Sequence, residues 1–263
     1  MTGRGLTTEQ VLELLQQTAE EVIRPRWRAL ADDEVSEKNP GDFVTVADHE
    51  SEERITAVLQ AAWPDALIVG EEAAAVHPSI VHQVHSAEHA FVVDPVDGTR
   101  NFIHGSKNYA VMVGEVRRGE ITRGWIWQPE LDRAWVAELG AGATCNGEAI
   151  NRPAPEKTAL VGSTTQRRLL RRTRPAEIAG DLGYTLYACG IDYPNMCLGI
   201  ADDFLIYRNM KPWDHVPGSL ILRELGGVSR MIDGTDYQGQ QTNLPLIAAV
   251  NQDVWDIARR CLD

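Results

Sequence analysis

A chain of 263 residues can bury a full hydrophobic core, and its length suits one large domain or two tightly joined halves. Its 25 basic and 38 acidic side chains give a formal charge of −13, which argues against a general nucleic-acid surface. No apolar run approaches the roughly 20 residues that a membrane span needs, and the N-terminus lacks the apolar segment of a signal peptide. We therefore expect a cytoplasmic protein that contacts neither membrane nor nucleic acid.

The chain begins with the signature of a packing helix. Thr7 and Gln10 form a capping-box pattern, and apolar residues then recur at helical spacing as far as Ile23. Pro25 should kink or end this helix, because proline cannot donate the next backbone hydrogen bond.

A polar loop and a second helix should follow. Residues 33–41 have the composition of an exposed loop, and this loop contains Lys38. An extended piece over 42–48 stops at Asp48, just before a helical pattern over 50–62. Asp48 is therefore a candidate N-cap, and a capping carboxylate can also hold a catalytic hydroxyl.

The central feature is the sequence Asp-Pro-Val-Asp-Gly-Thr at 94–99, directly after the apolar run 91–93. The carboxylates of Asp94 and Asp97 should emerge where a strand ends, and Gly98 permits a close backbone approach. An ordinary turn is the alternative, because Asp-Pro and Asp-Gly are common turn dipeptides.

Two other acidic motifs favour a metal site over a turn. Gly-Glu-Glu at 70–72 follows the apolar run 66–69, and Trp-Asp at 213–214 precedes a third periodic segment. Acids at the ends of separate elements are how sites for hard metal ions are built. Bound cations would also reverse the local charge, so the net charge of −13 does not exclude an anionic substrate.

Two segments rich in histidine or arginine each allow more than one interpretation. His82, His85 and His89 could share one helix face with metal-binding spacing, although a solvent-facing helix or a flexible loop is the preferred interpretation. Five arginines between positions 167 and 174 are either a solvated face or a patch for phosphates or a partner. The four cysteines lack C-x-x-C spacing, which indicates free, buried thiols.

The remaining elements predict layered helices and mixed sheets. Residues 109–116 and 121–127 read as a hairpin, with a further strand over 133–139. In the second half we expect strands over 160–163, 186–190, 204–207 and 246–250, and helices over 175–182, 195–201, 216–225 and 254–262.

Taken together, the motifs at 70–72, 94–99 and 213–214, with Glu-Leu-Gly-Gly at 224–227, resemble those of the inositol monophosphatase family. The resemblance extends from the first helix to the last. It implies an α/β (α+β) fold, a layered αβαβα sandwich like that of inositol monophosphatase and fructose-1,6-bisphosphatase. It also implies one domain over 1–263, with an N-terminal α+β half over about 1–145 and a C-terminal α/β half over about 146–263.

The resemblance implies a phosphoric monoester hydrolase that uses two or three Mg²⁺ ions. Glu71, Asp94 and the carbonyl of Val96 would hold one ion, and Asp94, Asp97 and Asp214 the second. Oxygen ligands of this kind suit Mg²⁺, and two ions on one phosphate can stabilise both the attacking and the leaving oxygen.

By the same resemblance, the catalytic residues are Glu71, Thr99 and Asp48, with the Thr99–Asp48 pair orienting the attacking water. The residues implied to bind the phosphate and its alcohol are Asp97, Gly98, Thr99, Asp192 and Asp214. Two of them, Asp97 and Asp214, are also metal ligands. Lys38 matches a lysine of the family's mobile loop, and Glu72 would support the site.

The substrate is the least defined part of the resemblance. The family's usual Gly-Ser/Thr-Ala-Ala segment is Gly-Ile-Asp-Tyr at 190–193 here. An inositol phosphate or a similar polyol or sugar phosphate is the leading expectation; histidinol phosphate, fructose 1,6-bisphosphate and a 3′-phosphonucleotide are the alternatives. A catalytically degenerate binding protein is a third reading. Family membership also implies inhibition by Li⁺ and a homodimer.

Overall fold

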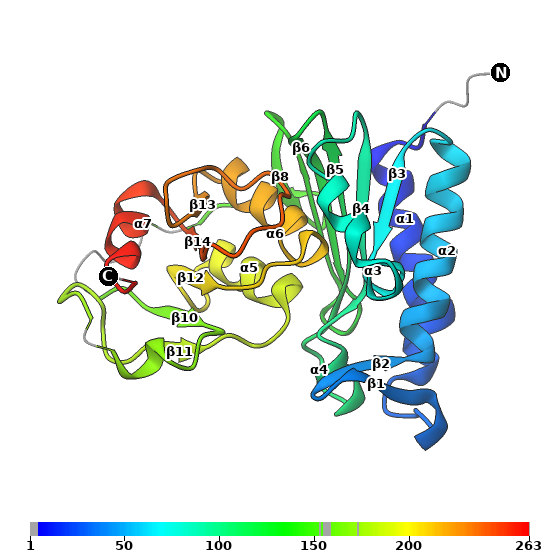
Figure 1. Ribbon diagram of the computed structural model, residues 1–263, viewed down its shortest axis with the longest axis horizontal. Helices are drawn as coiled ribbons and strands as arrows, with labels where there is room; N and C mark the ends of the chain where they lie inside the picture. Colours follow the sequence, from blue (N-terminus) through cyan, green and yellow to red (C-terminus); the bar gives the residue numbers. More distant parts are fainter. Residues whose placement is uncertain (1–4, 153, 155–158, 173, 263) are drawn as a thin grey trace.

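The computed structural model describes residues 5–152, 154, 159–172 and 174–262. Within them, layers of helix and sheet alternate: two helices, a seven-stranded sheet, two more helices, a five-stranded sheet and a last helix (Figure 1). The αβαβα sandwich expected from the sequence is therefore confirmed. The division into halves near residue 145 stays a prediction.

The larger sheet has the strand order β3-β4-β5-β6-β7-β8-β9. Only β3 and β4 run parallel to each other, and the other neighbours are antiparallel. The strands are β3 (Leu67–Gly70), β4 (Ala90–Asp97), β5 (Ala110–Arg117), β6 (Glu120–Gln128), β7 (Arg133–Glu138), β8 (Gly142–Cys145) and β9 (Glu148–Ala149). The predicted hairpin is β5–β6, and its turn residues Arg118 and Gly119 both have positive φ, as tight hairpins require.

The smaller sheet has the order β11-β10-β12-β14-β13 and mixes parallel and antiparallel pairs. Its strands are β10 (Gly162–Thr164), β11 (Gly183–Tyr184), β12 (Phe204–Tyr207), β13 (Val228–Met231) and β14 (Leu246–Ala249). Strand β13 was not expected from the sequence.

Helices cover both sheets (Figure 1). Helices α1 (Thr8–Thr18) and α2 (Val46–Ala62) pack on one face of the larger sheet. Helices α5 (Cys189–Leu198) and α6 (Pro212–Glu224) lie between the sheets, and α7 (Gln252–Arg259) covers the outer face of the smaller one. Short helices α3 (Glu71–Val76) and α4 (Thr99–Ile103) follow β3 and β4.

Helix α6 approaches the larger sheet closely because two strand positions are glycine. A Cβ at Gly114 would meet Val216 at 2.4 Å, and one at Gly124 would meet the Pro217 backbone at 2.9 Å. This close contact fixes the start of α6, and with it Asp214, against the sheet.

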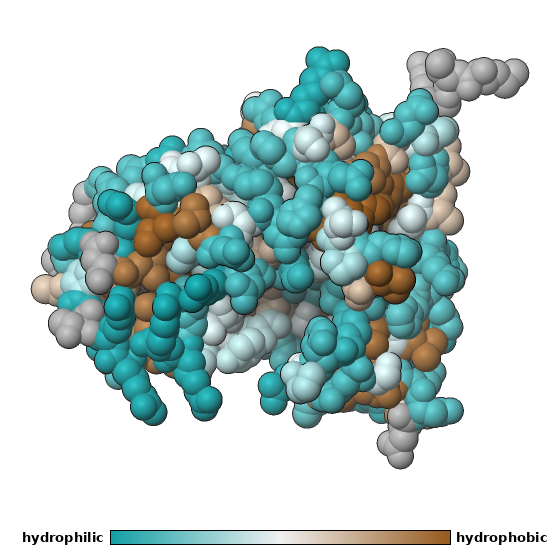
Figure 2. All heavy atoms as spheres, viewed as in Figure 1, coloured by the Kyte–Doolittle hydropathy of each residue, from teal (hydrophilic) through white to brown (hydrophobic). Residues whose placement is uncertain are grey.

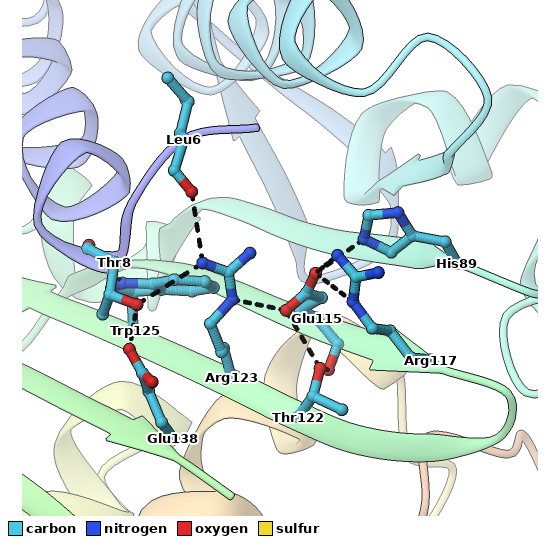
Figure 3. A network of polar contacts seen from close by, with 9 residues as sticks. All are labelled: Leu6, Thr8, His89, Glu115, Arg117, Thr122, Arg123, Trp125 and Glu138. Atoms are coloured by element: carbon cyan, nitrogen blue, oxygen red, sulfur yellow. Dashed lines mark hydrogen bonds and ion pairs between the residues drawn. The ribbon is translucent and has the colours of Figure 1, made fainter. Parts of the chain in front are cut away.

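A buried carboxylate, that of Glu115 in β5, connects neighbouring strands of the larger sheet through its hydrogen bonds (Figure 3). Glu115 is 1 % exposed and accepts hydrogen bonds from Arg117, Thr122 and Arg123, and it also bonds His89. Burial raises the pKa of Glu115, but these partners outweigh burial and hold it well below its usual range. The network is structural, because it surrounds a carboxylate that has no access to solvent.

Two expectations for the first half are wrong. The loop expected over 33–41 contains strand β1 (Val35–Asn39), which forms a hairpin with β2 (Asp42–Thr45), the beginning of the piece over 42–48 that was expected to be extended. Asp48 is not the N-cap of α2 but its third residue; Thr45 is the N-cap, and its N–H donates to Asp48 Oδ2 at 2.8 Å. A carboxylate at the third position of a helix accepts from the N–H of the N-cap residue, and α2 therefore begins at Val46, earlier than expected.

In the second half, the helix over 175–182 and the strand over 186–190 are absent from the described residues. The first segment instead pairs with the preceding chain through a bridge between Leu160 and Ile178. The second is a loop that leads into α5, which begins well before the expected residue 195.

Pro194 inside α5 explains this difference. Proline cannot donate to the carbonyl of Gly190, but that carbonyl accepts from Gln128 Nε2 at 2.6 Å instead. A distant side chain thus replaces the missing helix bond.

In the described chain, no helix is long and apolar enough to cross a membrane.

Candidate active site

The site is built where β4 ends. Asp94 and Asp97, the expected pair, are both buried there, at 2 % and 6 % exposure. The pairing of β4 with β5 shifts between them, so the strand is irregular at this point. Oδ1 of Asp94 has no hydrogen-bond partner among the described residues, which is costly for a buried carboxylate oxygen.

The N-terminus of α5 holds Asp97. The N–H groups of Cys189 and Gly190 donate to its two oxygens at 3.0 Å and 2.6 Å. A Cβ at Gly190 would meet Ala110 at 2.6 Å and Asp97 Oδ2 at 3.0 Å, so a glycine is needed for this approach. Burial raises the pKa of Asp97 to about 8, although the two N–H groups lower it.

Glu71 lies at the first position of α3 and pairs with Lys38 of the β1–β2 hairpin. Lys38 Nζ lies 2.6 Å from Glu71 Oε1 and 3.0 Å from Glu72 Oε1. Burial raises the pKa of Glu71 while the ammonium lowers it. The two glutamates in turn outweigh burial and raise the pKa of Lys38. The structure thus brings Lys38 to the site, as its sequence position suggested.

Thr99 connects the site to α2. Its hydroxyl lies 3.1 Å from Asp48 Oδ1 and 3.0 Å from the carbonyl of Val96. Asp48 is fully buried, and burial raises its pKa to about 7. Gly98 has φ 83° at the N-cap of α4, a conformation that favours glycine. The expected hydroxyl–carboxylate pair is therefore formed.

Asp214 lies in the first turn of α6 and completes a group of interacting carboxylates. Burial and the charges of Glu71, Asp97 and Asp214 raise the pKa of Asp94, and burial together with Glu71 and Asp97 raises that of Asp214. Like charges this close destabilise one another unless a cation lies between them. The unpartnered Asp94 oxygen and the all-oxygen donors fit Mg²⁺.

Two neighbours of Asp214, Cys189 and His215, carry ligand atoms that are softer than carboxylate oxygen, a sulfur and a nitrogen. One ligand atom from each of Cys189, Asp214 and His215 lies within 4.8 Å of the others, the one such group found in the described residues. His215 Nδ1 is already in contact with Tyr193 Oη at 3.2 Å, and burial lowers the pKa of His215 to about 3. The imidazole is therefore neutral and partnered, and the carboxylates fit a hard cation better.

A pocket of about 220 Å³ opens beside these residues, and the surface is hollowed between the part of the molecule that carries the smaller sheet and the part that carries the larger sheet (Figure 2). Asp97, Asp192 and Asp214 line the pocket. Both oxygens of Asp192 already accept hydrogen bonds, from the Leu186 N–H at 2.8 Å and the Tyr207 hydroxyl at 3.3 Å.

Sequence reasoning missed one supporting residue, Glu52 of α2. It accepts from the N–H groups of Glu72 and Ala73 at 2.7 and 2.8 Å, and so it caps α3 and fixes the chain around Glu71. A Cβ at Gly70 would overlap its carboxylate, at 2.1 Å. The signal was present, because Glu52 lies four residues after Asp48 and thus on the same helix face.

In the histidine segment, His82 lines a pocket that also contains Lys38 and Glu71, whereas the other residues considered have partners elsewhere. His85 contacts the Gln238 carbonyl at 3.3 Å and His89 contacts Glu115 at 2.7 Å, so these two have separate partners. Among the arginines, Arg172 donates to the Leu262 carbonyl and Arg174 to Asp181, and neither lines the pocket.

The protein is of the layered α/β class, with a group of buried carboxylates suited to a divalent cation. Comparison with known proteins agrees: the sequence profile described as "Inositol monophosphatase family" matches residues 7–258. The chain belongs to the inositol monophosphatase family, whose members are phosphoric monoester hydrolases.

Individual relatives cover most of the chain. It is 31 % identical over 255 residues to a chloroplastic phosphatase of Arabidopsis thaliana, IMPL1, covering 87 % of this chain and 63 % of that one. It is 31 % identical over 221 residues to the fructose-1,6-bisphosphatase/inositol-1-monophosphatase of Thermotoga maritima, covering 79 % and 77 %. The structure of the extragenic suppressor protein suhB from Bartonella henselae superposes with a TM-score of 0.79 at 25 % identity, covering 97 % and 98 %.

Proposed function

We propose that the protein hydrolyses a small phosphate monoester with the help of Mg²⁺. The observation that carries this proposal is the unpartnered oxygen of Asp94 inside a group of carboxylates that raise one another's pKa. Glu71, Asp94 and the carbonyl of Val96 would hold one ion, and Asp94, Asp97 and Asp214 another. When bound, Mg²⁺ supplies positive charge for the phosphate and lowers the pKa of a coordinated water.

The protein's own residues would direct the reaction. The Thr99 hydroxyl, placed against Asp48, would accept a hydrogen bond from the attacking water and pass its proton toward the carboxylate. Water then bonds to phosphorus as the ester P–O bond breaks, and the alcohol leaves with a proton. The N–H groups of Gly98 and Thr99 would donate hydrogen bonds to phosphate oxygens. Glu71 would lie close to the attacking water.

The alcohol half of the substrate is less constrained. Inositol phosphate is the reference substrate, because the Thermotoga maritima relative carries inositol-1-monophosphatase in its name. Histidinol phosphate, fructose 1,6-bisphosphate and a 3′-phosphonucleotide are the alternatives. For Asp192 we favour a positioning role over direct contact with substrate hydroxyls, because it is 3 % exposed and accepts hydrogen bonds from the Leu186 N–H and the Tyr207 hydroxyl.

A substrate panel tests the proposal. Phosphate release is measured for each of these esters with Mg²⁺ and with a chelator in its place. We expect release that depends on Mg²⁺ and is lost in Asp97→Asn but kept in Asp65→Asn, a change at an exposed carboxylate. Release unaffected by chelator, or unaffected by Asp97→Asn, would contradict the proposed site.

The remaining family properties are proposals as well. We expect inhibition by Li⁺, a homodimer and a cytoplasmic location. A degenerate binding protein is the other candidate, and it would bind a phosphate ester without releasing phosphate. The complete set of site carboxylates speaks against it, since their mutual repulsion brings no benefit without a cation.

A further inference from the structure

Gln128, the last residue of β6, is a buried polar side chain that the proposed reaction does not use. It is 0 % exposed, and its Nε2 donates to the Gly190 carbonyl at 2.6 Å. The same glycine donates its N–H to Asp97 Oδ2, also at 2.6 Å. Gly190 thus connects a side chain of the larger sheet to a carboxylate of the candidate metal site.

A tryptophan fixes the orientation of the Gln128 amide. Trp135 is fully buried in the neighbouring strand β7, and its Nε1 lies 3.3 Å from Gln128 Oε1. An indole N–H can only donate, so the amide oxygen faces Trp135 and the NH₂ group faces Gly190. Because β6 and β7 pair directly, the sheet itself determines where this donor lies.

The Gly190 carbonyl depends on this donor. In a regular α-helix it would accept from the N–H of residue 194, which in α5 is proline. A buried carbonyl without a partner is costly. The first turn of α5, whose N–H groups hold Asp97, is therefore stabilised by a hydrogen bond that comes from the larger sheet.

The backbone of α5 also lies directly on β5. A Cβ at Gly190 would meet Ala110 at 2.6 Å and Met112 Sδ at 2.9 Å. Asp97 pairs with the same Ala110 in the β4–β5 ladder. The sheet therefore sets the distance between Asp97 and the N-terminus of α5 in two ways, through β5 under Gly190 and through Gln128 of β6.

Building on the proposed function, in which Asp97 holds a Mg²⁺ ion, we propose that Gln128 is a positioning residue for this metal ligand. It holds the first turn of α5 at a fixed place on the sheet, so that the two N–H groups orient the Asp97 carboxylate toward the ion. Replacing a group that orients a metal ligand typically lowers metal affinity about 10- to 100-fold.

A purely structural role is the alternative. Gln128 would then only supply the hydrogen bond that Pro194 cannot donate. The two roles differ in one requirement. A positioning role needs a donor that belongs to the sheet, whereas a structural role is fulfilled by any donor to the Gly190 carbonyl.

A double variant separates the two roles. Gln128→Met removes the donor with little change in size, and the Mg²⁺ concentration for half-maximal phosphate release should rise about 10-fold, with kcat at saturating Mg²⁺ changed by less than about 3-fold. Pro194→Ala returns a backbone N–H to the helix. The combination Gln128→Met/Pro194→Ala should therefore regain thermal stability but keep the raised Mg²⁺ requirement. Gln128→Glu, which keeps an acceptor for Trp135, should behave like Gln128→Met.

A measurement without turnover and a matched control complete the test. The Mg²⁺ dependence of Tm, recorded without substrate, should shift to higher Mg²⁺ concentration in Gln128→Met by the same factor. Asn146, in the turn between β8 and β9, also bridges two main-chain groups: its amide accepts from the Ala134 N–H at 2.7 Å and donates to the Asp132 carbonyl at 2.9 Å. Asn146→Ala should lower stability and leave the Mg²⁺ requirement unchanged.

Three results would overturn the positioning role. They are an unchanged Mg²⁺ requirement in Gln128→Met, an equal rise in Asn146→Ala, and a return to the wild-type requirement in Gln128→Met/Pro194→Ala, because any donor would then suffice. Absence of phosphate release from wild type would instead contradict the proposed function, and the Mg²⁺ dependence of Tm would still decide the role of Gln128.

Discussion

Replacing Asp94 by asparagine should stabilise the metal-free protein and remove most of the stabilisation that Mg²⁺ gives. The residues Glu71, Asp94, Asp97 and Asp214 place four carboxylates near only two ammonium groups of the described residues, those of Lys38 and Lys211, so the group carries an excess of negative charge. Burial and this repulsion raise the pKa of Asp94, so its ionised form destabilises the fold at neutral pH. Without divalent cations, Asp94→Asn should therefore unfold at a higher temperature than wild type.

Adding Mg²⁺ should raise the Tm of wild type more than that of Asp94→Asn. An ion that binds only the folded state at 100 times its dissociation constant stabilises it by about 2.7 kcal/mol. For a chain of this size that is an increase in Tm of roughly 5–10 °C. Wild type should show this increase, and Asp94→Asn should show little of it, because the residue expected to bridge both ions is lost.

Thermal unfolding followed by circular dichroism, with Mg²⁺ titrated at constant ionic strength, measures both effects. Asp65→Asn removes an exposed carboxylate and should behave as wild type. The raised pKa values of the site carboxylates also determine how the stability of the metal-free protein depends on pH. The pKa values of Asp97 and Asp48 are raised to about 8 and about 7, so these carboxylates increasingly destabilise the fold as pH rises from their usual pKa to those values, and the stability of metal-free wild type should rise as pH falls from 8 toward 5. Equal Mg²⁺ responses in wild type and Asp94→Asn would refute this account.

Three further changes test other parts of the structure. Thr99→Val removes the hydroxyl that contacts Asp48 and should lower kcat by about 10²–10⁴, whereas Thr99→Ser should keep most activity; equal rates for the two variants would be evidence against a role for the hydroxyl. Gly190→Ala would place a Cβ 3.0 Å from Asp97 Oδ2, and we expect a loss of about 1–3 kcal/mol in unfolding free energy and a higher Mg²⁺ requirement in phosphate release; an unchanged requirement would contradict the backbone's role in holding that carboxylate. Glu115→Gln should cost about 3–5 kcal/mol at pH 7 in denaturant unfolding, because it leaves the largely buried Arg123 guanidinium without its carboxylate partner. Since the pKa of Glu115 is lowered, its contribution is present above the usual pKa and lost as pH falls through the folded value, so the gap between variant and wild type should narrow in acid; a constant gap would contradict the ion-pair explanation.

Local signals in the sequence predicted the elements whose stability is local. The capping box of Thr7 and Gln10 is present at the start of α1, and the hairpin at Arg118 and Gly119 has the turn that its sequence suggested. In these cases the residues that determine the conformation lie within a few positions of one another.

Elements that depend on distant partners were missed or misplaced. Helix α5 contains Pro194, and only the hydrogen bond from Gln128 to the Gly190 carbonyl makes that proline tolerable. The loop at Tyr187 looked like a strand because it is apolar, but Asp192 and Asn101 hold it in another conformation. Tertiary contacts of this kind leave no periodic pattern in the chain.

The site itself was more predictable than the second half of the fold. Its acidic motifs stand at the ends of elements, where the fold brings Asp94, Asp97 and Asp214 into electrostatic contact. The acidic motifs do not define the residues that face the alcohol, because those residues are brought to the pocket by separate loops and share no local pattern.

The most direct test of the central claim is the initial rate of phosphate release as Mg²⁺ is titrated, with wild type and Asp214→Asn compared on the preferred substrate. We predict that release is absent with chelator, rises to saturation with Mg²⁺ in wild type, and in Asp214→Asn is at least about 100-fold slower at every Mg²⁺ concentration. Release that does not depend on Mg²⁺, or equal curves for the two proteins, would contradict the assignment of these carboxylates as the catalytic metal site.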